Sequence, residues 1–339
     1  MTAVASRPGP APSPVKTQVS TWHTISPLVV ALFAAAAAYA VHRLFIGTSL
    51  GQTIDTAALQ GGDIDHPRVS EVLGRTLNGT RLVVLAGVCL LAAAFGALRR
   101  RMDLALAAGF LVVAANVATQ QLKAGLERPL LDGVPMPNSW PSGHATAAAS
   151  AAFVLVLVFP RAMRGMVGLA GAGYVAIVSV ATVWAEWHRP SDAIAALFIV
   201  LACGSLALFG VRLARRGGPS RSLQLPNRLV MICLGIAAAL SVAGAVFGMA
   251  SVAVSERALP ELVSDRFAFL TGTAGILAAT AVTFIVWVRL TAAEPAPAPP
   301  APAPARTRPA VPARSSTKSS VKTSAKPATK PSAEQGAKS

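Results

Sequence analysis

Three short polar segments interrupt the long apolar stretches of this chain, and they carry the side chains best suited to chemistry. The segments are Lys123–Pro129, Pro141–His144 and His188–Asp192. Together they supply imidazoles, a carboxylate, a hydroxyl and basic side chains, which are the groups that bind a phosphate and move protons around it. The three cysteines lie inside apolar stretches without paired spacing, so no disulfide framework or thiolate metal site is indicated.

The segment from His188 to Asp192 predicts a paired imidazole and carboxylate. Pro190 favours the start of a helix, and the two side chains meet if His188 lies just before that helix. A carboxylate on one ring nitrogen selects the tautomer and raises the nucleophilicity of the other nitrogen. His188 is therefore a candidate nucleophile that would form a phosphohistidine. A helix cap with an interfacial histidine is the alternative interpretation.

The segment from Pro141 to His144 has the features of a phosphate cradle. Pro141 suits the first turn of a helix, and Gly143 lets the backbone approach a ligand whose charge faces free N–H groups. Ser142 adds a hydroxyl, and His144 could protonate a departing alkoxide. An ordinary capped helix start would explain the proline and the serine but not the histidine.

The segment that begins at Lys123 supplies cations. Lys123 and Arg128 could neutralise phosphoryl oxygens, the arginine through its planar fork and the lysine as a point charge. Pro129 keeps Arg128 out of helical geometry, so Arg128 is expected to project from a turn. Alternatively, both residues anchor a helix end among lipid headgroups.

The elements that must position these segments are membrane-spanning helices. The chain has 339 residues, of which 53% are hydrophobic and 13% are charged, and stretches of about 20 residues carry no charge. We predict an all-α, polytopic transmembrane helical bundle. The first stretch could instead be a signal peptide, because Ala38-Tyr39-Ala40 resembles a cleavage site. The predicted spans are 25–46, 82–98, 104–121, 145–159, 166–185, 192–211, 229–250 and 268–289.

Charge sets the expected topology. The net charge is +16, and the basic residues fall in alternate loops and in the tail, whereas most acidic residues fall in the opposite loops. Both termini are thus predicted to be cytoplasmic, with the three polar segments on the outer side of the cell membrane. Nucleic-acid binding is not expected. Residues 291–339 are rich in Pro, Ala and Lys and predict a disordered tail, whose lysines could bind anionic headgroups or an acidic partner.

Taken together, the segments resemble the type 2 phosphatidic acid phosphatase (PAP2) superfamily, whose motifs read Lys-x6-Arg-Pro, Pro-Ser-Gly-His and Ser-Arg-x5-His-x3-Asp in that order. The second motif matches completely, and the third matches at His188 and Asp192. The resemblance implies a six-span core at 25–213, after a tail at 1–24. Two extra spans at 214–290 lie outside it.

By this resemblance the chain is a metal-independent lipid-phosphate phosphatase without a cofactor. His188 is expected to be the nucleophile, Asp192 its orienting partner and His144 the general acid and base. Ser142 and Gly143, together with Lys123 and Arg128, are expected to bind the phosphate. The implied substrates are lipid phosphomonoesters and polyprenyl diphosphates. The expected partners are therefore these lipid phosphates and the surrounding membrane lipids.

Two motif positions depart from the family pattern. The first motif is short, so that alignment on Lys123 puts Leu130 where arginine is expected. The Ser-Arg pair of the third motif falls on Ala181-Thr182, so a phosphate-binding arginine is absent. Arg128 or Arg189 could compensate, because a guanidinium can reach the same oxygens from another backbone position.

Two other functions stay open from the sequence. The missing arginine allows a non-catalytic protein that binds or transports lipid phosphates. A metal-dependent hydrolase with His144, His188 and Asp192 as ligands is the other. The segment Asp63-Ile-Asp65-His66 also suggests a metal site, but we expect a solvated acidic loop because no second ligand cluster accompanies it.

Overall fold

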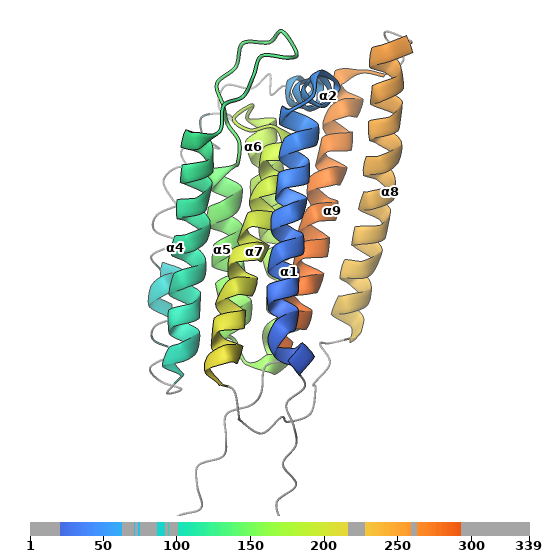
Figure 1. The fold of residues 1–339 in the computed structure, drawn as a ribbon. Coiled ribbons are helices and arrows are strands. Elements are labelled where there is room, and N and C mark those ends of the chain that lie inside the picture. Colours follow the sequence, from blue (N-terminus) through green and yellow to red (C-terminus); the bar gives the residue numbers. More distant parts are fainter. Residues whose placement is uncertain are drawn as a thin grey trace, which may run out of the picture. The chain divides into compact units, whose positions relative to one another are not determined.

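The computed structural model describes residues 21–62, 71, 74, 87–91, 94, 101–215, 228–258 and 263–292. Its regular elements are helices that run side by side in a bundle (Figure 1), which confirms the predicted all-α class. The elements are α1 (Thr21–Val41), the π-helical turn η1 (His42–Ile46), α2 (Ser49–Gln60), α4 (Met102–Gly125), α5 (Gly143–Val158), α6 (Arg161–Trp184), α7 (Pro190–Ala214), α8 (Arg228–Ala258) and α9 (Asp265–Ala292).

Six of the described helices are long and apolar enough to cross a membrane, which indicates a multi-pass membrane protein. They are α1 with η1, α4, α6, α7, α8 and α9. The fourth predicted span appears as α5, which has only 16 residues and is about 24 Å long, less than the ~30 Å hydrocarbon core. Most of the predicted span at 82–98 lies outside the described residues.

The helix α5 is enclosed by its neighbours because its residues are small. Nearly every residue of α5 is buried, including the alanine-rich stretch 145–152. Small side chains let transmembrane helices approach closely, which compensates for the absence of a hydrophobic driving force between helices in lipid. This tight packing holds the N-terminus of α5 in a defined position.

The last helix, α9, belongs to the same core as α5. Its Trp287 ring stacks on Phe153 of α5 with centroids 4.8 Å apart, and Trp287 Nε1 donates a hydrogen bond to the Phe153 carbonyl at 3.0 Å. Helix α9 also packs against α2, α6, α7 and α8. The segment predicted as an additional hairpin therefore shares its hydrophobic core with the helices of the predicted six-span core.

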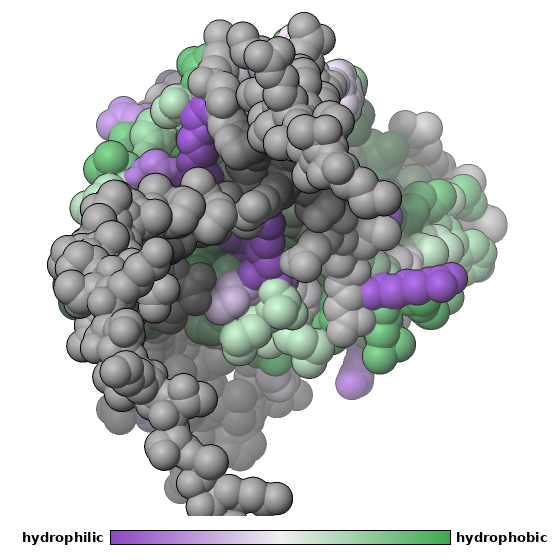
Figure 2. Space-filling view, turned by 90° about the horizontal axis from the view of Figure 1, so that it is seen from below, coloured by the Kyte–Doolittle hydropathy of each residue, from purple (hydrophilic) through white to green (hydrophobic). Residues whose placement is uncertain are grey.

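Buried arginines tie helix ends together at the opposite end of the bundle from α2. Arg164 donates hydrogen bonds to the carbonyls of Leu157 and Phe159 at the end of α5 and of Thr291 in α9. Arg212 bonds His23 and Ser26 of α1, which connects the end of α7 to the start of α1. Figure 2 views this end and shows hydrophilic residues set among hydrophobic ones.

The sequence predicted a loop after the first span and missed helix α2. Thr48 caps this helix, because its Oγ1 accepts a hydrogen bond from the Gly51 amide at 3.0 Å. Helix α2 lies across the end of the bundle close to α9 and the loop that follows α4 (Figure 1). Its end meets the start of α9 so closely that a Cβ atom on Gly61 would lie 1.9 Å from the Asp265 carbonyl oxygen.

Candidate active site

All three polar segments lie at the end of the bundle that carries α2 (Figure 1). Lys123 to Pro129 includes the last turn of α4 and the start of the next loop, Ser142 caps α5, and His188 precedes α7. Helices that alternate in direction bring these distant segments to one end. The candidate site is thus built from one loop and two helix N-termini.

His188 and Asp192 lie side by side, as their spacing predicted. His188 Nδ1 is 3.4 Å from Asp192 Oδ2, and both side chains are buried. Pro190 is the first residue of α7, so the carboxylate rises from the first helical turn toward the imidazole before it. This arrangement favours a proton on Nδ1 and leaves Nε2 with its lone pair.

Three further groups hold Asp192 in place. Its Oδ2 accepts hydrogen bonds from Ser139 Oγ at 2.5 Å and from the Arg189 amide at 3.0 Å. The Asp192 carbonyl oxygen accepts a hydrogen bond from the Ser142 amide at 3.0 Å. The starts of α5 and α7 are therefore directly connected through this residue.

The start of α5 differs in register from the sequence prediction. Pro141 does not lie in the first turn; it precedes Ser142, which is the N-cap, and the helix begins at Gly143. Ser142 Oγ accepts a hydrogen bond from the Ala145 amide at 3.3 Å. Ser142 thus caps the helix, as the alternative interpretation of this segment supposed, and Gly143 occupies the first turn beside His144.

His144 reaches the nucleophile candidate from the neighbouring helix. Its ring centroid lies 5.8 Å from that of His188 and 5.4 Å from that of Trp187. His144 is partly exposed, whereas His188 is buried. Two imidazoles of different accessibility therefore face the same small volume.

Arg189 is a buried residue and not an interfacial anchor, with only 1% of its surface exposed. Its Nε donates a hydrogen bond to Thr56 Oγ1 at 3.3 Å. Its Nη2 atom is buried and has no hydrogen-bond partner among the described residues. A guanidinium that is held at one nitrogen and unsatisfied at another is suited to bind an anion.

Thr182 occupies the position of the absent motif arginine and has a structural role. Its carbonyl oxygen accepts hydrogen bonds from the amides of Trp187 and His188. Between Thr182 and Trp187, Glu186 adopts a left-handed conformation with φ of 58°, which reverses the chain after α6. Thr182 therefore closes the turn that presents His188.

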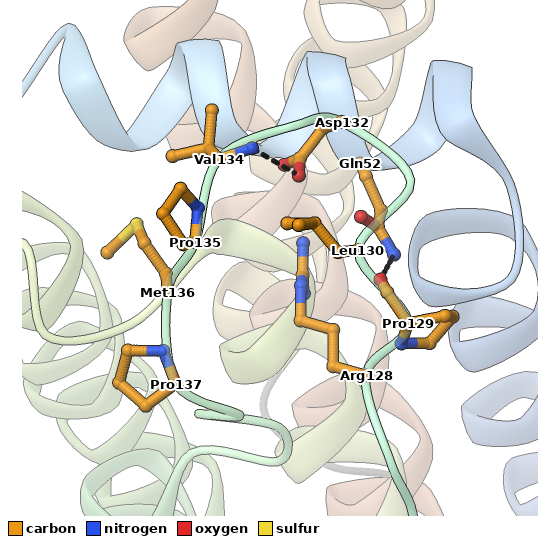
Figure 3. Close-up of a pocket in the computed structure, with 9 residues that line it drawn as sticks. All are labelled: Gln52, Arg128, Pro129, Leu130, Asp132, Val134, Pro135, Met136 and Pro137. Carbon is orange, nitrogen blue, oxygen red and sulfur yellow. Dashed lines mark hydrogen bonds between the residues drawn. The ribbon is translucent and has the colours of Figure 1, made fainter.

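Arg128 projects from the loop after α4, as its position before Pro129 predicted. Its guanidinium points into a cavity of about 360 Å³ walled by Pro129, Leu130 and residues 134–137 (Figure 3). Burial, followed by the nearby charge of Arg189, lowers the pKa of Arg128. The two Nη atoms of Arg128 are buried and donate no hydrogen bond within the described part of the chain.

Lys123 lies in the last turn of α4 and is partly exposed. Its carbonyl oxygen accepts a hydrogen bond from Asn138 Nδ2 at 3.3 Å, and Asn138 also binds the carbonyl of Leu126. These contacts fold the loop back over the end of α4. The role of the Lys123 ammonium group in phosphate binding stays a prediction.

The sequence interpretation missed Asp55, which it placed in an outer loop. Asp55 lies in α2 and is buried, and its two carboxylate oxygens accept hydrogen bonds from Ser191 N at 3.0 Å and Ser191 Oγ at 2.5 Å. The stretch Gln52, Asp55, Thr56 and Leu59 has helical spacing. That spacing was the one available signal for α2, and it could not reveal that this polar face is buried.

Burial, and next the negative charge of Asp192, raises the pKa of Asp55 to about 7. The unfolded chain releases this proton near pH 4, so between these two pH values the folded protein binds more protons than the unfolded protein. Stability must therefore fall as the pH rises through this interval. The difference between the two pKa values corresponds to roughly 4 kcal/mol.

We expect the thermal unfolding midpoint of the detergent-solubilised protein to be lower at about pH 8 than at about pH 5. Asp55→Asn should flatten this dependence and unfold at a higher temperature at the alkaline pH, because the amide has no proton to lose. Comparison of the two proteins across pH isolates the contribution of Asp55 from those of other groups. Parallel curves for both would contradict the assignment.

Among the described residues, no group of three or more His, Cys, Asp or Glu side chains is arranged to hold a metal ion. The segment from Asp63 to His66 lies outside these residues. The hypothesis of a metal-dependent hydrolase is tested by chelation below.

Comparison with known families agrees with this geometry. Residues 104–216 match the model of the PAP2 superfamily, so the part of the chain that holds α4 to α7 is a PAP2 superfamily domain. The match includes His144, His188 and Asp192. No curated protein and no solved structure matched the chain.

Proposed function

We propose that this protein is a membrane phosphatase that hydrolyses a lipid phosphomonoester or a polyprenyl diphosphate through a phosphohistidine at His188. The proposal is carried by the convergence of two imidazoles, with ring centroids 5.8 Å apart, next to a carboxylate that holds one of them. The buried Arg189, together with Arg128, whose Nη atoms are buried, supplies the positive charge that a phosphoryl group requires. PAP2 superfamily membership of the domain suggests the same reaction class.

In the first step, His188 Nε2 attacks phosphorus and forms a P–N bond. The P–O bond to the lipid alcohol breaks at the same time, or the bridging P–O bond if the substrate is a diphosphate. His144 donates a proton to the leaving oxygen. Asp192 stabilises the positive charge that develops on the His188 ring, since its carboxylate accepts a hydrogen bond from Nδ1–H.

In the second step, water attacks the phosphohistidine. His144, now neutral, accepts a proton from this water while the P–N bond breaks and inorganic phosphate leaves. His188 returns to its starting tautomer because Nδ1 keeps its proton throughout, hydrogen-bonded to Asp192. No step needs a metal ion, and Arg189 and Arg128 are proposed to bind the phosphoryl oxygens in both steps.

The site is proposed to face the non-cytoplasmic side of the cell membrane, with both chain termini in the cytoplasm. The support is the distribution of arginines: Arg101, Arg161, Arg164, Arg212 and Arg215 all flank the helix ends opposite the site. Basic residues near span ends are retained on the cytoplasmic side. A lipid phosphate would then reach the site from the outer leaflet.

A second candidate is a protein that binds or transports lipid phosphates without turnover. One observation favours it, since Thr182 replaces the motif arginine and its hydroxyl donates to the Ser179 carbonyl within α6. The two functions differ in whether inorganic phosphate is released. Binding of lipid phosphates without release of inorganic phosphate from any of them would favour this second candidate.

The test is phosphate release by purified protein from a panel of phosphatidate, phosphatidylglycerol phosphate and polyprenyl mono- and diphosphates, measured with EDTA present. We expect at least one substrate to be turned over at the same rate with and without the chelator, because the proposed steps use only side chains. Loss of activity on chelation would point to the metal-dependent alternative.

A further inference from the structure

Helix α2 buries its polar face against the candidate site. Gln52, Asp55 and Thr56 are at most 3% exposed, and each bonds a different part of the site. Gln52 bonds the loop after α4 through the carbonyl of Pro129 and the amide of Leu131. Thr56 bonds both Arg189 and Asp132. A helix that only rested on the membrane surface would direct such residues toward water.

In the contact between Asp55 and Ser191, both carboxylate oxygens accept a hydrogen bond. Ser191 is the second residue of α7, and it donates both its amide and its hydroxyl to the two oxygens of one carboxylate. The first amides of a helix have no partner within the helix, and a carboxylate at that end also faces the positive end of the helix dipole. Asp55 therefore fixes the first turn of α7 from outside.

This first turn carries the carboxylate that orients the nucleophile. Asp192 follows Ser191 directly and contacts His188 Nδ1 at 3.4 Å. A shift of the turn by a fraction of this distance would break the contact. Asp55 itself bonds only Ser191 among the residues for which contacts are described, so it acts through α7 and not on the phosphate.

Helix α9 packs against both sides of the Asp55–Ser191 contact, at Ala58 of α2 and Pro190 of α7. A Cβ atom on Gly272 would lie 2.5 Å from Pro190 Cγ and 3.2 Å from the Cβ of Ala58. The absence of a side chain at Gly272 thus lets α2 and the start of α7 sit against one surface of α9. The position of Ser191 relative to Asp55 is determined by packing on two sides.

Burial of a carboxylate beside a second carboxylate costs stability, so its presence needs another reason. We infer that Asp55 is a positioning residue for the His188–Asp192 pair, acting through its two hydrogen bonds to Ser191. This inference rests on the proposed function. It assigns a catalytic contribution to a helix outside the residues matched by the family model.

Turnover and phosphoenzyme formation of Asp55→Ala and Asp55→Asn test the inference. Asp55→Ala should lower kcat by about 10- to 100-fold and leave KM within about threefold, because a misplaced orienting group slows chemistry more than binding. Asp55→Asn should recover most of this loss. The amide oxygen can still accept from Ser191 N, and the amide nitrogen can donate to Ser191 Oγ.

The rate at which labelled phosphate appears on the protein in a single turnover should fall in parallel with kcat for Asp55→Ala. A purely structural residue would change the amount of folded protein and not this rate per folded molecule. The matched control is Asp265→Asn, which removes the same charge from the exposed first turn of α9 at the same end of the bundle. It should behave as wild type.

Wild-type kcat in folded Asp55→Ala would overturn the inference. Equal losses in the alanine and asparagine variants would also overturn it, since the charge of Asp55 would then matter and its hydrogen bonds to Ser191 would not.

If Asp55→Ala does not fold, Ser191→Ala replaces it, because this variant deletes only the hydroxyl contact. Unchanged turnover of Ser191→Ala would refute the role. His188→Ala is measured alongside. Activity in His188→Ala would refute the proposed function, whereas an inactive His188→Ala beside an active Asp55→Ala refutes only this inference.

Discussion

His188→Ala should abolish the proposed phosphate release, with an expected loss in kcat of about 10⁴-fold or more, as is typical for removal of a covalent nucleophile. Alanine has no atom that can form the P–N bond, and water entering the space would lack the orienting contact with Asp192. The loss should appear in kcat with little change in KM, because the arginines proposed to hold the phosphoryl group are still present. Phosphate release from the best substrate of the panel measures it.

A trapping experiment separates the nucleophile from a general base. Wild-type protein quenched during turnover should carry a phosphoryl group that is stable to base and labile to acid, as a phosphoramidate is, and His188→Ala should carry none. His23→Ala is the matched control, because His23 lies in α1 at the opposite end of the bundle. A labelled intermediate that persists in His188→Ala would place the covalent bond on another residue.

Arg189→Gln has the second largest expected effect, a loss in kcat/KM of about 10²- to 10³-fold, which is the usual consequence of removing one buried donor to a developing charge. Arg189 is buried, its Nε is held by Thr56, and its Nη2 has no partner within the described structure. Such a guanidinium is already oriented and desolvated before the substrate arrives. Glutamine keeps the polarity of the side chain and removes the charge.

Arg189 also lies close enough to Arg128 for its charge to lower the pKa of Arg128, although Asp55, Asp192 and Asp132 act in the opposite direction. The Nη atoms of Arg128 have no hydrogen-bond partner among the described residues, so this second guanidinium is also suited to a phosphoryl group. Arg128→Gln should therefore be impaired as well, though less than Arg189→Gln, because Arg128 is more exposed. Arg266→Gln removes an exposed arginine at the start of α9 and serves as the control.

An Arg189→Gln variant with wild-type kcat/KM and reduced thermal stability would identify Arg189 as a structural anchor for α2. The phosphate-binding cation absent from the third motif would then have no substitute in α7. In that case the second candidate function, binding of lipid phosphate without turnover, would gain support.

The sequence alone predicted those features that depend on neighbours a few residues apart. Spacing of four residues, with Pro190 at the helix start, was enough to place Asp192 beside His188. Pro129 was enough to put Arg128 in a turn, and the long apolar stretches were enough to predict spanning helices. These signals are local because backbone geometry and helix periodicity act over one or two turns.

Only the tertiary structure decided which polar residues are buried together. The Asp55–Ser191 and Thr56–Arg189 contacts join residues more than 130 positions apart. A polar face on an amphipathic helix has the same sequence pattern whether it contacts water or protein. The sequence could therefore not distinguish a surface helix from one that supports the site. The same ambiguity hid the burial of Arg189 and the role of α9, because burial is a property of the assembled bundle and not of any single segment.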